Sequence, residues 1–276
     1  MAKNSRFFDN NNKIIHIYGY HSVKAALKNK NRKKKRLILS DNSSKYYTND
    51  FGGYLKEIQE VKVLPKKKFD KTYSLEANNQ GIILEAYDLK IKSIKEILNE
   101  ENRNKRSILI MLDQKKDPQN IVSIKRSPAI FNCKSIILSK DNSPNMNSTI
   151  IKSASGGAEI VNYIQVTNLV RCIKEIKENN FWVIGLDSES KKTIDNFEIP
   201  DKCLFVLGSE HSGLRKLTKN NCDHIISIKS KNIANLEIDS LNVSNATSIV
   251  LYEHFKKKLI RLQKNKNCDI NRTEPA

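Results

Sequence analysis

The sequence predicts an α/β protein in which a small α/β domain precedes a larger domain built on a parallel sheet. From residue 107 onward, short apolar runs alternate with segments of helical periodicity. Some of these runs, such as residues 204–207, are apolar at every position, as in strands buried on both faces of a parallel sheet. The runs stop at polar or glycine residues, so we expect several polar loops to meet at the carboxyl edge of one sheet.

The first part of the chain predicts a separate small domain, residues 14–88. Residues 1–13 are polar, Asn-rich and without periodicity, so we expect them to be disordered. Within the small domain the expected strands are residues 15–18, 37–39, 61–64 and 81–84, and the expected helices are residues 21–27 and 51–61.

A charged stretch, residues 89–106, is expected to link the domains and to carry an amphipathic helix at residues 94–99. Residues 107–262 predict the larger domain, and residues 263–276 a flexible basic tail. The strands expected in the larger domain are residues 107–112, 135–138, 164–166, 181–186, 204–207 and 224–228. The expected helices are residues 120–131, 148–155 and 169–177, with a last helix whose start holds residues 240–246.

The charge of the chain favours a polyanionic partner. Lys and Arg number 49 against 30 Asp and Glu, which gives a net charge of +19 and a pI of about 9.6. Nucleic acid and a membrane surface are the two candidates. No apolar run approaches the ~18 residues of a spanning helix, and the first residues lack the apolar core of a signal peptide. We therefore expect a cytoplasmic protein without membrane contact.

Residues 28–36 form the densest basic run, because seven of these nine residues are Lys or Arg. Such a run is often a solvated loop. Its place between an expected helix and strand of a small separate domain also allows contact with RNA phosphates. Both interpretations stay open from the sequence.

Several chemistries lack their usual motifs. No GxGxxG follows the first strand of the larger domain, and no GxxxxGK[ST] is present. The histidines show no ligand spacing, so no metal site is expected. The cysteines are odd in number and form no CxxC pair, so we expect them to be reduced and mostly buried. They are Cys133, Cys172, Cys203, Cys222 and Cys268.

Three polar segments are expected at the rim of the parallel sheet. The first follows residue 112 and turns at Pro118, so that Asn120 lies where a helix N-cap is expected and Arg126 lies further along that helix. The second is the glycine-flanked loop at residues 208–213. The third, residues 240–246, places small and amide side chains at the start of the last helix, where free N–H groups point outward.

These segments resemble the three motifs of the SpoU/TrmH (SPOUT) family of RNA ribose 2'-O-methyltransferases. They read DPQN at residues 117–120 with Arg126, GSE at residues 208–210 with Gly213-Leu214, and SLNVSNA at residues 240–246. Two N-terminal segments, Tyr18-Gly19-x-His21 and Asn79-Gln80-Gly81, resemble the accessory RNA-binding domain of the RlmB-like branch, which modifies a guanosine in 23S ribosomal RNA.

The resemblance implies a trefoil knot in the parallel-sheet domain, S-adenosyl-L-methionine as cofactor and a homodimer formed through that domain. It implies transfer of a methyl group to a ribose 2'-hydroxyl of ribosomal RNA. Two alternatives remain: a related enzyme acting on tRNA, and a non-catalytic RNA-binding protein that retains the fold.

By the same resemblance, backbone groups at Gly208, Ile228 and Leu241 hold the cofactor. For Gly208 we expect that the missing Cβ lets the main chain approach the ligand. The positions that correspond to catalytic and substrate-orienting residues are Asn120, Arg126, Glu210, Ser240 and Asn242. Because a guanidinium stays protonated, we expect Arg126 to grip a phosphate and stabilise developing alkoxide charge.

The chain departs from the family pattern at Val122-Ser123, Pro128, Asn132 and Lys229-Ser230. Pro128 is expected to kink its helix near residue 124. Asn132 replaces a C-terminal glycine, a mild change because Asn tolerates the left-handed conformation.

Overall fold

The computed structural model describes residues 14–73, 79–89, 91–113, 123–124, 126–140, 159–210, 212–229 and 241–270. Contacts divide the chain into two compact units. Unit 1 comprises residues 1–91 and 146–160, and unit 2 comprises residues 92–145 and 161–276. The domain boundaries expected from the sequence stay a prediction, but Glu159 and Ile160 group with unit 1 although they lie late in the chain.

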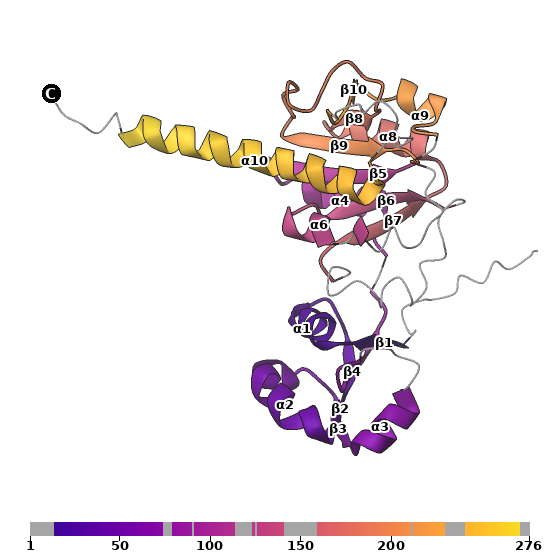
Figure 1. Ribbon diagram of the computed structural model, residues 1–276, viewed down its shortest axis with the longest axis vertical. Helices are drawn as coiled ribbons and strands as arrows, with labels where there is room; N and C mark the ends of the chain where they lie inside the picture. The colour runs from indigo at the N-terminus through magenta and orange to yellow at the C-terminus, as the bar shows by residue number, and fades with distance from the viewer. Residues whose placement is uncertain are drawn as a thin grey trace, which may run out of the picture. The chain divides into compact units, whose positions relative to one another are not determined.

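Unit 1 is a four-stranded sheet with helices on both faces (Figure 1). Its strands are β1 (Ile14–Tyr18), β2 (Lys34–Ser40), β3 (Glu60–Leu64) and β4 (Ile82–Tyr87). Its helices are α1 (Tyr20–Lys28), α2 (Asp41–Leu55) and α3 (Lys66–Tyr73). The strand order is β1-β4-β2-β3, and only β2 and β3 run parallel.

The helices of unit 1 form where apolar residues recur at helical spacing. In α1, Val23, Ala26 and Leu27 are buried and pack with α2 against one face of the sheet. In α2 the buried residues are Tyr47 and Phe51, one turn apart. The expected helix at residues 51–61 was wrong, because this helix starts ten residues earlier and β3 begins at Glu60. The first residues of α2 are polar, so the pattern of apolar residues does not indicate where this helix starts.

The basic run is neither wholly solvated nor wholly available to RNA. Arg32 is buried, and its Nη2 lies 2.5 Å from Oε1 of the buried Glu159. Lys34 is also buried and pairs with Glu57 at 2.5 Å. The exposed members include Lys28, Lys30 and Lys33. Part of the run therefore holds unit 1 together, and part remains for solvent or a ligand.

Unit 2 is a six-stranded, fully parallel sheet covered by helices (Figure 1). Its strands are β5 (Ser107–Leu112), β6 (Ser135–Ser139), β7 (Asn162–Val166), β8 (Trp182–Leu186), β9 (Lys202–Leu207) and β10 (His224–Ile226). Its helices are α4 (Ile94–Glu101), α6 (Arg126–Ile130), α8 (Leu169–Glu178), α9 (Lys216–Asn220) and α10 (Val243–Ile270). The strand order is β10-β8-β9-β5-β6-β7.

Two layers of helices enclose the sheet of unit 2. Helices α4 and α8 share one core cluster with alternate strand residues, among them Leu109, Met111 and Val206. Helix α10 packs on β9 and against α6, and its buried Val250 and Leu251 lie outside that cluster. We infer that α6 and α10 cover the opposite face, which gives the three-layer arrangement expected of a buried parallel sheet.

Most expected elements of unit 2 are confirmed within one or two residues, and β5 agrees at both ends. The expected helix at residues 148–155 lies outside the described residues, as do residues 230–240, so the trefoil knot stays a prediction. Asn132 has φ 60°, which confirms the left-handed conformation expected there. In the part of the chain that the structure describes, no helix is long and apolar enough to cross a membrane.

Two glycines of unit 1 should respond oppositely to a methyl group. Gly52 lies within α2 with open space around it, so Gly52→Ala should raise the free energy of unfolding by ~1 kcal/mol. Gly81 has φ +71°, and a Cβ there would lie 2.5 Å from Oγ of Ser40, so Gly81→Ala should lower it by ~2 kcal/mol. Urea unfolding followed by far-UV circular dichroism measures both, and equal effects would contradict this assignment.

Candidate active site

The strand order of unit 2 marks one position on the carboxyl edge of the sheet. Strands β5 and β9 are neighbours, but the chain leaves β5 toward β6 on one side and leaves β9 toward β10 on the other. Open parallel sheets bind ligands where the connections diverge in this way. Asp113 follows β5 and Gly208 follows β9, and the Asp113 N–H donates to the Leu207 carbonyl at 2.8 Å.

The loop after β9 closes tightly on itself. The N–H of Ser209 donates to the Gly213 carbonyl at 3.0 Å, and the N–H of Gly213 donates back to Ser209 at 3.0 Å. A Cβ on Gly208 would lie 2.0 Å from the Gly213 carbonyl carbon. The missing Cβ is therefore required by the loop's own closure. The close approach of a ligand to this backbone, expected from the sequence, stays a prediction beside this contact within the chain.

A buried ion pair ties this loop to β5. Asp113 is fully buried, and its Oδ1 accepts from Nε of Arg215 at 2.6 Å. Its Oδ2 accepts from the backbone N–H of Arg215 at 3.1 Å. Because both carboxylate oxygens are bound to one residue, the carboxyl end of β5 and the start of α9 are held together.

The same loop also reaches the start of α10. Oε1 of Glu210 accepts from Nδ2 of Asn242 at 3.2 Å and from the backbone N–H of Val243 at 3.3 Å. Oδ1 of Asn242 accepts from the N–H of Ser244 at 2.8 Å, which makes Asn242 the N-cap. A carboxylate at this end is also favoured by the helix dipole. Glu210 therefore fixes where the last helix begins.

The structure brings four of the expected site residues into one region. Glu210 and Asn242 share a hydrogen bond, Gly208 lies two residues before Glu210, and Leu241 precedes Asn242. The expectation that the second and third rim segments converge is confirmed by this bond. Ile228 is half-buried two residues after β10.

The remaining expected residues are described less fully. Arg126 begins α6, but the placement of its side chain is not among the described features. Asn120 and Ser240 lie outside the described residues. Their roles stay predictions.

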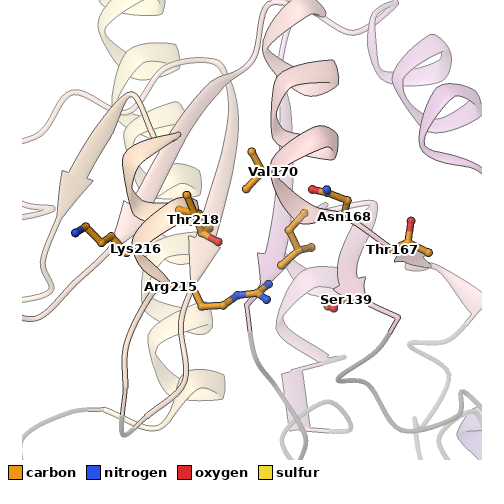
Figure 2. Close-up of a pocket in the computed structure, with 9 residues that line it drawn as sticks. Ser139, Thr167, Asn168, Val170, Arg215, Lys216 and Thr218 are labelled. Atoms are coloured by element: carbon orange, nitrogen blue, oxygen red, sulfur yellow. The ribbon is translucent and has the colours of Figure 1, made fainter.

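Sequence reasoning missed Asp113 and Arg215. The acidic residue directly after a fully apolar strand, and the arginine directly after Gly213-Leu214, were the available indications. Arg215 also lines a cavity of about 520 Å³ near the ends of β6 and β7 (Figure 2). No sequence motif pointed to this cavity.

The described cysteines are poorly suited to act as nucleophiles. Burial raises the pKa of the Cys133, Cys172 and Cys222 thiols to about 12, so they stay protonated at neutral pH. All four described cysteines are free and three are buried, which confirms the expectation for them. Among the described residues, no group of three His, Cys, Asp or Glu side chains is placed to hold a metal ion.

Comparison with known proteins identifies relatives of both parts of the chain. Residues 107–252 match the model of the SpoU rRNA Methylase family, and residues 16–91 match the model for RNA 2'-O ribose methyltransferase substrate binding. The 23S rRNA (guanosine-2'-O-)-methyltransferase RlmB of Neisseria meningitidis is 34% identical over 164 residues, which is 59% of this chain and 64% of that protein. The alignment thus spans less than two thirds of this relative.

Two further comparisons cover more of the chain. The protein of the same name from Vibrio parahaemolyticus is 33% identical over 253 residues, covering 88% of this chain and 97% of the relative. The crystal structure of the SpoU methyltransferase AviRb from Streptomyces viridochromogenes in complex with AdoMet superposes with a TM-score of 0.70 at 16% identity, covering 89% and 91% of the two chains. The structural likeness supports the fold.

The Asp113–Arg215 pair should respond asymmetrically to substitution. Arg215→Ala leaves the buried Asp113 carboxylate without a partner, so it should lower the free energy of unfolding by ~3 kcal/mol. Asp113→Asn leaves the Arg215 side chain, which is already 39% exposed and can be solvated. This change should lower the free energy of unfolding by about 1–2 kcal/mol. Trp182, the single tryptophan, lies in unit 2, so its fluorescence in urea reports this unfolding. A larger cost for Asp113→Asn would contradict the assignment.

The N-cap of α10 can be separated from the link to Glu210. Asn242→Ala removes both and should lower the free energy of unfolding by ~1 kcal/mol or more. Asn242→Ser keeps a capping oxygen and should cost only a few tenths of a kcal/mol (~0.3). Tryptophan fluorescence in urea measures both. If Ser and Ala cost the same, Asn242 does not act as the cap.

Proposed function

This chain belongs to the SpoU rRNA Methylase family, and we propose that it is an S-adenosylmethionine-dependent RNA methyltransferase. In this proposal it transfers a methyl group to a ribose 2'-hydroxyl of a guanosine in 23S ribosomal RNA. This substrate is supported by the relatives from Neisseria and Vibrio, which are named 23S rRNA (guanosine-2'-O-)-methyltransferases. The match of residues 16–91 to an RNA 2'-O ribose methyltransferase substrate-binding model supports an RNA-binding role for unit 1.

The observation that carries the proposal is the link between Glu210 and the start of α10. Two segments that resemble family motifs, 32 residues apart at Glu210 and Asn242, are joined by a hydrogen bond at 3.2 Å. This contact brings the second and third motif segments together at one rim, as the family resemblance requires of a shared site. The amide of Asn242 is held through its oxygen by Ser244 and through its nitrogen by Glu210, so its orientation is fixed.

The residues beside this link fit the proposed cofactor. S-adenosylmethionine, when bound, supplies an electrophilic methyl group on its sulfonium. Leu241 is 42% exposed and Ile228 is half-buried, so both offer apolar surface beside the carboxyl ends of β9 and β10. Apolar surface next to backbone N–H and C=O groups suits an adenine ring. We assign the backbone of Gly208, Ile228 and Leu241 to cofactor binding.

The catalytic roles follow from side-chain chemistry. Asn120, Ser240 and Asn242 can orient the ribose by hydrogen bonds. The guanidinium of Arg126, which stays protonated, grips a neighbouring phosphate and stabilises the negative charge that develops on the 2'-oxygen as its proton leaves to water or another group. Glu210 orders the rim by holding Asn242 and the Val243 N–H.

A homodimer through unit 2 is part of the proposal. Exposed apolar side chains gather on α6 and α10: Ile130 is 72% exposed, Tyr252 50% and Leu259 45%. Phe131 lies between them, with its ring centroid 6.1 Å from that of Tyr252 and 5.8 Å from that of Phe255. An apolar surface of this kind favours burial against a second copy.

We propose a cytoplasmic location, where such an RNA substrate is found.

A map of ribose methylation in RNA from cells with and without the gene tests the function. We expect one guanosine site of 23S rRNA to lose its methyl group without the gene and to regain it with the native chain. Arg126→Lys should restore ~100-fold less methyl transfer, because an ammonium cannot make the two-pronged phosphate contact. Arg171→Lys, at an exposed position of α8, is the matched control and should restore it fully.

The other outcomes separate the alternatives. If all rRNA sites persist and a tRNA site is lost, the tRNA enzyme is correct. If calorimetry detects no S-adenosylmethionine binding at millimolar concentration, the non-catalytic RNA-binding protein is correct.

A further inference from the structure

We propose that the cavity between the starts of α8 and α9 binds one nucleotide of the RNA strand next to the methylated ribose and holds its phosphate through Arg215, with the positive charge of Lys216 on the same segment adding to the attraction. This inference rests on the proposed function, because it adds a second binding position on the same rim. The cavity measures about 520 Å³. That volume lies within the range of ~300–1,000 Å³ typical of small-molecule sites and exceeds what a single water or ion needs.

The fold places the cavity on the catalytic side of the sheet. Ser139 ends β6, and Thr167 follows β7. The opposite wall comes from Arg215 to Thr218, the segment that follows the rim loop. In a parallel sheet all carboxyl ends lie on one edge, so the cavity and Glu210 share that edge. Its complete lining is Ser139, Thr167, Asn168, Leu169, Val170, Arg215, Lys216, Leu217 and Thr218.

The charge of this lining suits a phosphate. Two adjacent residues, Arg215 and Lys216, are cationic, and none of the described lining residues is acidic. Figure 2 shows the Arg215 side chain extended from the start of α9 into the space beside Ser139. Its Nε is fixed by Asp113 at 2.6 Å, so the guanidinium is held in place before a ligand arrives. A pre-organised guanidinium fork matches phosphate oxygens with little loss of side-chain entropy.

The rest of the lining suits a nucleoside. Leu169, Val170 and Leu217 provide apolar surface, and Leu217 is 71% exposed although it lies beside a cavity. The hydroxyls of Ser139 and Thr167 can donate to or accept from ribose and base groups. Cations that neutralise the RNA backbone are one part of how single-stranded RNA is held, and the apolar side chains give the base a surface to lie against.

A charge-reversal pair tests the phosphate contact. Lys216→Glu should weaken binding of a fluorescein-labelled single-stranded RNA hexamer by about tenfold and lower the slope of log affinity against log salt by ~1. Lys174→Glu makes the same charge change at an exposed site on α8 outside the cavity, and should weaken binding by less than about threefold. Equal losses in the two variants would overturn the proposal, because the effect would then be that of net charge alone.

A second variant fills the cavity without changing charge. Val170→Trp should weaken binding of the hexamer by about tenfold, with circular dichroism and the unfolding midpoint confirming that the chain is folded. Native affinity in this variant would overturn the proposal.

The free nucleotide guanosine 5'-monophosphate should bind at least ~100-fold more weakly than the hexamer. Equal affinity would mean that the cavity takes a free nucleotide instead of RNA.

Cofactor titration separates this inference from the proposed function. S-adenosylmethionine affinity should be the same in native, Lys216→Glu and Val170→Trp proteins. If cofactor binds and methyl transfer proceeds but the cavity variants bind RNA normally, only the inference fails. If the cavity variants lose RNA affinity but the native chain binds no cofactor, only the proposed methyltransferase function fails.

Discussion

The buried carboxylate of Asp113 is the contact on which the rest of the rim depends. It is fully buried at the end of β5 and is satisfied by the backbone and side chain of Arg215. Because a buried charge without a partner is costly, the segment that carries Arg215 has one favourable position. Gly213 and Ser209 then close the loop, and Glu210 at its tip sets the start of α10. A series of hydrogen bonds therefore connects β5, at the centre of the sheet, to the start of α10.

The sequence predicted those features whose determinants lie close together in the chain. Apolar runs gave the strands of unit 2, and glycine-flanked polar segments gave the rim, because strand burial and turn chemistry are local properties. The contact between Glu210 and Asn242 was anticipated only as a convergence of loops. Family motifs supplied the rest of that assignment, since periodicity alone assigns no ligand.

What the sequence did not predict depends on partners far away in the chain. Asp113 and Arg215 are 102 residues apart, and Arg32 and Glu159 are 127 apart. No local pattern distinguishes a lysine or arginine that will be buried in an ion pair from one that will meet solvent. One steric requirement for glycine at position 208 was missed for the same reason, because a Cβ there would lie 2.0 Å from the Gly213 carbonyl carbon, which only the folded loop brings close.

The hydrogen bonds and ion pair around Glu159 also bear on the order in which the protein folds during translation. Its carboxylate accepts from Arg32 and from Nδ2 of Asn29, and Arg32 donates in turn to the Tyr87 carbonyl. Asn29, Arg32 and Tyr87 are all synthesised within the first 91 residues, whereas Glu159 comes much later. Because an unpaired charge is costly to bury, the Arg32 guanidinium reaches its final packing only after Glu159 has been made, and therefore after β5 and β6 of the other unit.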